Sequence, residues 1–167
     1  FGFVSELGEP WPHSDPIAAQ VLNGPGQCFN EVPYCLRGAF AAYWAKNGGL
    51  EQFGYPITPE VVEHQGDQTY IVQYTERARF EYHPENAPPY DVLLGLLGNT
   101  LADPRAGEGP FQPVPASAAP GVQWFKETGH NVGVPFLAYW QSHGGLAVFG
   151  LPRSEAFDEK NAADGKT

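Results

Sequence analysis

Four polar side chains occupy every second position of the segment "RARFEYH", at Arg77, Arg79, Glu81 and His83. Alternate residues of a β-strand point to the same side of a sheet, so this spacing predicts a polar strand face. Guanidinium, carboxylate and imidazole groups on one face can bind the hydroxyls or the carboxylate of a ligand. Salt bridges between neighbouring strands are the competing interpretation, and it is the favoured one.

Two carboxylates of the same region, Glu76 and Glu81, are the candidates for acid–base chemistry. Glycosidases need such a pair at a defined separation, which a sequence does not supply. The sequence has no G-x-S-x-G nucleophile elbow, no H-E-x-x-H zinc motif and no glycine-rich phosphate loop. We therefore predict a protein without catalytic activity, cofactor or metal, and keep a hydrolase that uses Glu76 and Glu81 as the third hypothesis.

The four tryptophans fall into two groups. Trp44 and Trp140 belong to aromatic sets spaced i, i+3 and i+4, which line one helix face and favour a place in the core over a role in binding. Trp11 and Trp124 lie outside these sets, near prolines or glycines, and are better candidates for exposed rings. An aromatic ring can stack on the C–H face of a sugar, so both are candidate ligand-binding residues.

A long stretch of the chain occurs twice, because positions 29–58 align with positions 125–154 without a gap. In each copy the aromatic stripe predicts a short helix, over 38–47 in the first, and a Gly-Gly pair predicts its left-handed end. The F-G-x-P stretch predicts a tight, non-helical connector. Thr58 is then expected to cap a second short helix. The structural residues of the two copies are Trp44, Gly48, Gly49, Gly54 and Pro56, and Trp140, Gly144, Gly145, Gly150 and Pro152.

Further elements follow the first copy. Apolar residues alternate with polar ones over 70–83, which predicts a β-hairpin, and the apolar stretch 89–101 predicts a short buried helix or strand. The proline-rich stretch 105–120 predicts a linker. The predicted organisation is an N-terminal extension (1–28), a first repeat unit (29–104), the linker (105–120), and a second unit (121–167) that stops before its hairpin.

Cys28 and Cys35 are the only cysteines in the sequence. Structural metal sites usually need four ligands, whereas a disulfide needs two cysteines, so the pair predicts a disulfide. A disulfide implies an oxidising compartment. The chain begins at Phe1 and contains no Met, as we expect of a processed chain or of a fragment.

Composition narrows the fold and the partners. A net charge of −10 repels nucleic acid and anionic lipid, and the longest apolar stretch is too short to span a bilayer. We therefore expect no nucleic-acid partner and no membrane insertion. Twenty Gly and 17 Pro favour short elements joined by structured loops. The predicted fold is α+β and loop-rich, built from tandem repeats of a short helix and a β-hairpin.

The pattern G-x-F-x-x-Y-W-x-x-x-G-G-L-x-x-F-G-x-P-x-[TS] resembles the LGFP repeat of bacterial cell-surface proteins. Val134 replaces the first glycine in the second copy, and Phe53 and Phe149 replace the leucine of the family name. Such repeats occur in exported proteins beside hydrolases, esterases and amidases, which they are thought to hold at the cell envelope. The resemblance implies a non-catalytic module that binds envelope glycan. The residues that carry it are Gly38, Trp44, Gly48, Gly49, Gly54, Pro56 and Thr58, and Trp140, Gly144, Gly145, Gly150, Pro152 and Ser154.

Two functions from different classes follow. The first is an extracellular or cell-surface module that binds cell-envelope polysaccharide through aromatic and polar grooves, or anchors a larger protein there. The alternative is a structural subunit of a surface layer or extracellular filament, which would form homo-oligomers. The missing hairpin of the second copy motivates this alternative, because residues 1–28 or another chain could complete the unit by strand exchange.

Overall fold

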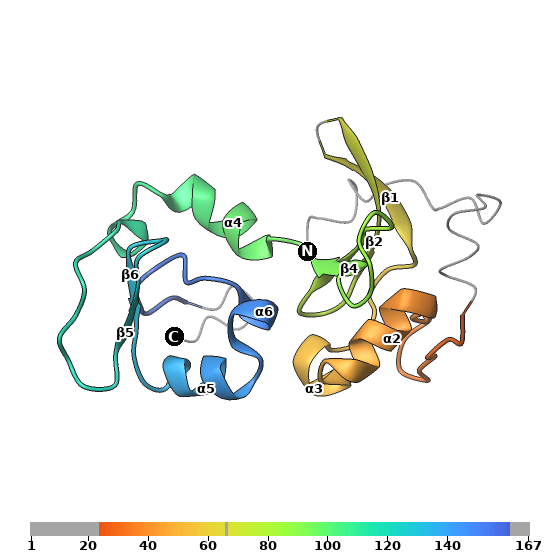
Figure 1. The fold of residues 1–167 in the computed structure, drawn as a ribbon, viewed down its shortest axis with the longest axis horizontal. Coiled ribbons are helices and arrows are strands. Elements are labelled where there is room, and N and C mark those ends of the chain that lie inside the picture. Colours follow the sequence, from red (N-terminus) through yellow and green to blue (C-terminus); the bar gives the residue numbers. More distant parts are fainter. Residues whose placement is uncertain (1–23, 66, 161–167) are drawn as a thin grey trace. The chain divides into compact units, whose positions relative to one another are not determined.

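The computed structural model describes residues 24–65 and 67–160 (Figure 1). Contacts within the chain divide it into unit 1, which ends at Gly95, and unit 2, which begins at Leu96. Each unit combines short helices with a small antiparallel sheet. The predicted α+β, loop-rich fold is therefore confirmed. Among the described residues, no helix has the length and apolar character needed to cross a membrane.

The first helices of unit 1 are α2 (Gly38–Lys46) and α3 (Gly49–Phe53), both short. Between them Gly48 has φ 109° and ψ −3°, a left-handed conformation that residues with a Cβ rarely adopt. The helix predicted over 38–47 is confirmed, because α2 spans Gly38–Lys46 with Asn47 as its C-cap. The indole Nε1 of Trp44 donates to the Gly54 carbonyl at 3.0 Å, which fixes the connector after α3.

A four-stranded antiparallel sheet follows in the order β1-β2-β3-β4. The predicted hairpin corresponds to β2 and β3, and β1 and β4 extend it on either side. The predicted second helix after Thr58 is wrong. The Thr58 hydroxyl accepts a hydrogen bond from the Tyr74 amide at 3.1 Å and so holds an extended segment beside β2. The strands are β1 (Val61–Gln65), β2 (Gln68–Tyr74), β3 (Arg79–Tyr82) and β4 (Val92–Leu94).

The loop of the β2–β3 hairpin determines which side chains share a face. Four residues, 75–78, separate the paired residues Tyr74 and Arg79, so an even-numbered position on β2 opposes an odd-numbered one on β3. Ile71 therefore lies on the same face as Tyr82, whereas Tyr74 lies on the face that carries Arg79. The apolar positions predicted on β2 therefore pair with polar positions on β3, as Tyr74 pairs with Arg79 and Val72 with Glu81. Polar and aromatic groups consequently share one face of the sheet.

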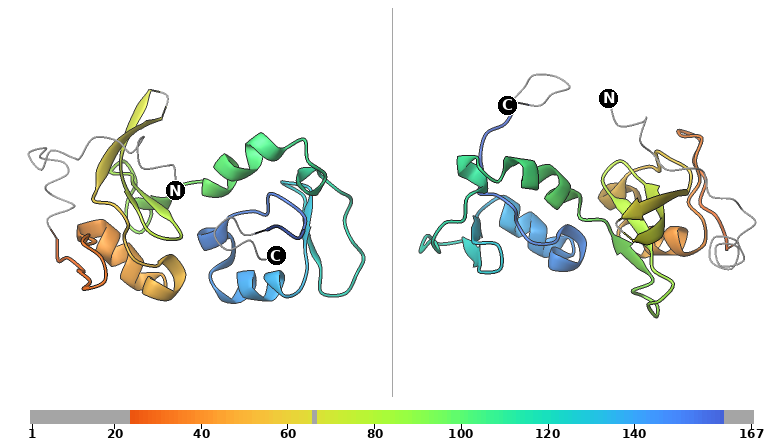
Figure 2. Two further views of the ribbon diagram at one scale, coloured as in Figure 1. Left: turned by 180° about the vertical axis from the view of Figure 1, so that it is seen from behind. Right: turned by 90° about the horizontal axis from the view of Figure 1, so that it is seen from above.

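Helices α2 and α3 lie on the other face of this sheet (Figures 1 and 2). The fully buried ring of Phe80 from β3 occupies the centre of the contact, with its centroid 5.9 Å from Phe40, 5.5 Å from Tyr43 and 5.1 Å from Phe53. Trp44 is also buried in this core. Full burial of one such ring stabilises a fold by about 1.5–3 kcal/mol relative to exposure. The aromatic stripe of α2 thus packs against the sheet, with Phe80 at the centre of a core that also contains Ile71 and Tyr82.

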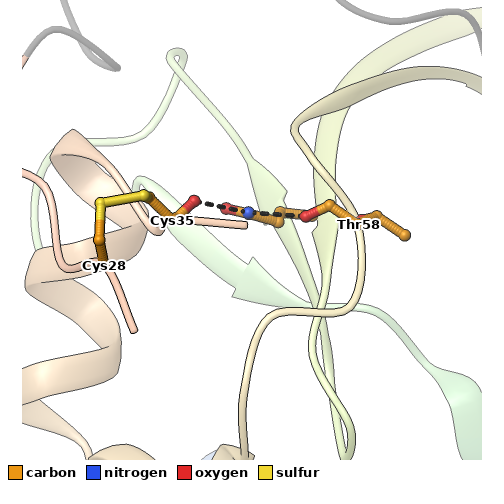
Figure 3. Close-up of a disulfide and its surroundings, with 4 residues drawn as sticks. Cys28, Cys35 and Thr58 are labelled. Carbon is orange, nitrogen blue, oxygen red and sulfur yellow. Dashed lines mark hydrogen bonds between the residues drawn. A yellow bond between two sulfur atoms is a disulfide. The ribbon is translucent and has the colours of Figure 1, made fainter. Parts of the chain in front are cut away.

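The predicted disulfide between Cys28 and Cys35 is confirmed (Figure 3). The fully buried Gln73 side chain of β2 donates through Nε2 to the carbonyl oxygens of Cys35 and Thr58, each at 3.0 Å, and the dashed lines in Figure 3 mark these bonds. One strand amide thereby joins the disulfide loop to the segment that leads into β1. A buried amide nitrogen without such acceptors would cost free energy.

Unit 2 begins with α4, followed by two 3₁₀ turns that extend into the segment predicted as a linker. The expected burial of the apolar stretch 89–101 holds for Val92 and is wrong for Tyr90, Leu93, Leu96 and Leu101, which are exposed. The six-residue helix α4 buries only Ala102. The elements of unit 2 are α4 (Leu97–Ala102), η2 (Asp103–Arg105), η3 (Gly109–Phe111), β5 (Gln123–Phe125), β6 (His130–Val132), α5 (Phe136–Ser142) and α6 (Gly145–Phe149).

The aligned stretches have closely similar local structures. Gly144 has φ 106° and ψ −2°, and Trp140 Nε1 donates to the Gly150 carbonyl at 3.1 Å, as their aligned residues do in unit 1. The strand pair β5–β6 occupies the positions aligned with the bridge between Gln27 and Leu36. The likeness ends after the connector, since no sheet follows α6 in the described residues. Tandem repetition of the whole unit is therefore not confirmed.

Candidate functional site

The polar face of the sheet in unit 1 carries a buried ionic group, which we call the Arg79 cluster and which consists of Glu63, Arg79, Glu81 and His83. The Arg79 side chain is only 6% exposed. Its Nη2 and Nε donate to Glu63 Oε2 at 2.8 and 3.1 Å, and its Nη1 donates to Glu81. A buried guanidinium needs such paired carboxylates, because an isolated charge in the interior is costly.

His83 lies between two carboxylates. Its Nε2 is 3.2 Å from Glu81 and its Nδ1 is 2.8 Å from Glu85. Both ring nitrogens of His83 are thus engaged with carboxylates. The hydrogen bond of Glu85 to its own backbone amide, together with His83, lowers the pKa of this carboxyl.

Tyr74 completes the polar face above Arg79. Its hydroxyl donates to Glu63 Oε1 at 2.8 Å, and the Arg79 guanidinium lies 5.9 Å from the centre of its ring. Burial, reinforced by the hydrogen bond to Glu63, raises the pKa of Tyr74 to about 12. The phenol is therefore a donor over the whole physiological range of pH.

Gly95 packs directly against the Arg79 cluster. A Cβ at this glycine would lie 2.8 Å from Glu81 Oε1 and 2.9 Å from Arg79 Nη1. The charged groups thus form ion pairs with one another, and the backbone at Gly95 packs closely against them. It offers a ligand few free donors or acceptors on Arg79 and Glu81.

Arg77 and Glu76 lie apart from this cluster. Arg77 donates to the Leu50 carbonyl at 3.2 Å, and the Glu76 carboxylate accepts from the Tyr55 amide at 3.2 Å. Both side chains cover Gly54, where a Cβ would lie 2.7 Å from the Cβ of Glu76. The turn of the β2–β3 hairpin therefore closes over the connector after α3. Of the four polar residues predicted to share one face, the structure joins Arg79, Glu81 and His83 and separates Arg77.

Trp124 lies on β5 in unit 2 with its side chain partly open, and the residue is 40% exposed. Its Nε1 donates to the Val114 carbonyl at 3.1 Å, which fixes the ring orientation. The opposing residue Asn131 anchors the same loop, accepting from the Ser117 amide at 2.8 Å and donating to the Pro115 carbonyl at 3.1 Å. The segment 114–117 is thus bound to the β5–β6 hairpin.

The position of Trp124 has a different occupant in unit 1. The pair Trp124 and Asn131 aligns with Cys28 and Cys35, so a disulfide stands where unit 2 has an exposed ring. The other candidate aromatic platform, Trp11, lies outside the described residues. Trp140 is partly buried against Phe125, with ring centroids 5.3 Å apart, as predicted for a packing residue.

Unit 2 exposes a second aromatic surface, which we call the open aromatic face and which consists of Phe136, Tyr139, Leu146 and Phe149. Phe136 is 61% exposed and Phe149 is 39% exposed, whereas the aligned Phe40 and Phe53 are buried in unit 1. The Tyr139 ring stacks on His143 at 3.9 Å and lies 5.7 Å from Phe149. The sequence predicts one helix face from this spacing in both copies, and among the described residues this face is exposed in unit 2.

Sequence reasoning did not single out Glu63, Tyr74 or Asn131. The strand order places Glu63 of β1 beside Arg79 of β3 across β2, a relation that no local pattern contains. Within the described part of the chain, no three His, Cys, Asp or Glu side chains come together as a metal site requires. Comparisons with profiles of protein families, with curated proteins and with solved structures found no match to this chain.

Proposed function

We propose that the chain is a non-catalytic extracellular module that binds cell-envelope polysaccharide through the Trp124 surface of unit 2. The observation that carries this proposal is a partly exposed indole held in one orientation by its hydrogen bond to Val114. A ring fixed before binding loses little conformational freedom when a sugar stacks on it. The aligned cysteine pair of unit 1 provides no such ring.

The surroundings of Trp124 suit a neutral polysaccharide. Lys126 and Glu127 are exposed in the turn of the same hairpin and can bond sugar hydroxyls. A net charge of −10 disfavours an anionic polymer. One shallow ring predicts weak binding to a single sugar unit, so a polymer with many binding positions is the fitting ligand.

Two further features support an extracellular or cell-surface location. The Cys28–Cys35 disulfide is stable in an oxidising compartment. The recurring helix and connector segment resembles the LGFP repeat of envelope-associated proteins. Hydrolysis by Glu76 and Glu81 stays a prediction, and the hydrogen bonds of these two carboxylates to Tyr55 and Arg79 give it no particular support.

Titration of the chain with soluble neutral envelope polysaccharide, followed through the indole N–H signals by NMR, tests the proposal. We expect a saturable shift of the Trp124 signal, and a loss of affinity of about tenfold or more in Trp124→Ala, as for a central contact residue. Tyr90→Ala is the matched control, because Tyr90 is an exposed aromatic residue of unit 1. Absence of a saturable shift at millimolar sugar across a glycan panel would exclude this function.

A second candidate function, a self-associating structural subunit, is favoured by the open aromatic face. Its four large apolar side chains are exposed, and exposed apolar surface commonly marks a protein–protein contact. Light scattering over a concentration range tests it, since self-association through this face predicts a mass that rises with concentration and a monomer in Phe136→Ser. A constant monomer mass at high concentration would exclude assembly by this route.

A further inference from the structure

We propose that the open aromatic face of unit 2 is a docking site for a β-hairpin of another polypeptide that presents an aromatic side chain as Phe80 does in unit 1. The inference goes beyond polysaccharide binding and does not rest on it. It adds detail to the second candidate function, the self-associating structural subunit, because it states which kind of element would cover the open aromatic face.

Unit 1 shows how such a face is covered. Phe80 of β3 seats its ring within 5.9 Å of Phe40, Tyr43 and Phe53. All three residues have an aligned counterpart of the same type in unit 2, at Phe136, Tyr139 and Phe149. The counterparts are present, but the strand residue that would contact them is not among the described residues.

The arrangement of the rings in unit 2 is close to that of the covered face. Tyr139 and Phe149 lie 5.7 Å apart, and the aligned Tyr43 and Phe53 lie 5.9 Å apart. His143 takes the place of Asn47, since both side chains bond the carbonyl of the preceding turn, at 2.9 and 2.8 Å. Tyr139 and Phe149 are therefore already arranged much as the aligned rings are in the covered face of unit 1. A docking hairpin would need to order these side chains little, which lowers the entropic cost of docking.

The connector after α6 supplies an independent second observation. Gly150 has φ 68° and ψ −160°, close to the 74° and −168° of Gly54. In unit 1 this conformation lets Glu76 and Arg77 of the hairpin turn approach Gly54, whereas a Cβ at Gly150 would meet nothing within 4 Å. Unit 2 thus keeps the backbone geometry that receives a hairpin turn, with the space above it open.

The backbone contacts of unit 1 define the expected partner. The amides of Glu76 and Arg77 donate to the carbonyls of Tyr55 and Phe53 at 3.0 and 3.1 Å. A fitting hairpin therefore has a four-residue turn that reaches the connector, an acidic residue in that turn, and an aromatic residue four positions later, as Glu76 and Phe80 have. These features distinguish a hairpin partner from a generic apolar surface.

The test appends a second copy of residues 61–95 to the C-terminus of the whole chain through a flexible Gly/Ser linker. The linker raises the effective concentration of the hairpin to the order of millimolar, so weak docking becomes measurable. We expect the amides of the appended strands to exchange about tenfold or more slowly than in a control whose appended copy carries Phe80→Ser. The Tyr139 ring signals should shift in the first protein and not in the control.

Two outcomes would overturn the proposal. One is equal amide exchange with and without the appended aromatic ring. The other is a shift of Tyr43 instead of Tyr139, which would mean that the appended hairpin replaces the sheet of unit 1. A variant of the graft with Phe136→Ser removes the receiving face while leaving the appended sequence intact, and it should abolish the protection.

Discussion

The segments α2–α3 and α5–α6 have nearly the same sequence pattern and backbone, yet one is a core and the other a surface. Phe40 is fully buried and the aligned Phe136 is 61% exposed. In unit 1 this face packs against sheet residues such as Phe80, and no sheet follows α6 in the described part of unit 2. An amphipathic helix therefore shows which face needs a cover and does not show that the cover is present.

The largest expected effect separates the two aligned phenylalanines. Phe40→Ala should destabilise unit 1 by about 3–5 kcal/mol, because it leaves a cavity beside Phe80. Phe136→Ala should change the stability of unit 2 by no more than about 0.5 kcal/mol, as for an exposed side chain. Denaturant unfolding followed by NMR signals of each unit measures both, and equal costs would refute the contrast between core and surface.

Removal of the disulfide should affect unit 1 alone. Cys28→Ser together with Cys35→Ser should destabilise unit 1 by about 2–3 kcal/mol, since the short loop gains conformational freedom in the unfolded state. Unit 2 has Trp124 and Asn131 at these positions and serves as the internal control. Thermal unfolding of the oxidised and mutant chains gives the comparison; loss of stability in unit 2 would mean that the units do not respond separately.

Alanine substitution at Gly54 and Gly150 tests whether a hairpin turn packs on the connector in unit 1 and not in unit 2. Both glycines combine positive φ with an extended ψ, a region that residues with a Cβ rarely occupy, so Gly54→Ala and Gly150→Ala share a backbone cost of about 1–3 kcal/mol. Gly54→Ala should cost about 1–2 kcal/mol more, because its Cβ collides with Glu76. Amide exchange in each unit measures the difference, and equal costs would argue against close packing of the hairpin turn on Gly54.

The smallest effect concerns pH. The pKa of Tyr74 is raised to about 12, above the value of about 10 expected for an unfolded chain. Its contribution to stability is therefore fully present below pH 10 and is lost as the pH rises from about 10 to 12. Burial raises the pKa of Tyr43 and Tyr82 in the same direction, so unit 1 as a whole should weaken over this range.

Absorbance of tyrosinate checks this last expectation. Tyr74→Phe should remove one late-titrating phenol and reduce the loss of stability of unit 1 between pH 10 and 12. If the absorbance lost in this variant is that of a phenol ionising near pH 10, Tyr74 ionises with an unperturbed pKa, contrary to its contact with Glu63.

The sequence predicted Trp124 as an exposed ring and only part of the Arg79 cluster. Trp124 stands out in the sequence because it lies outside the aromatic stripe, and its partial exposure agrees with that reading. The alternation of Arg79, Glu81 and His83 predicts a shared polar face, and these three residues lie together. Glu63 could not be assigned to them, because its contact with Arg79 depends on the strand order.

The sequence by itself determined local features of the chain, namely backbone conformations at single residues and the disulfide. Glycine at positions 48 and 144 permits the left-handed helix end, and two cysteines seven positions apart can close a disulfide. Tertiary structure decided the rest. The four-residue loop after Tyr74 sets which side chains share a sheet face, and a strand distant in sequence decides whether an aromatic helix face is covered. Burial needs two surfaces, and a local pattern describes only one of them.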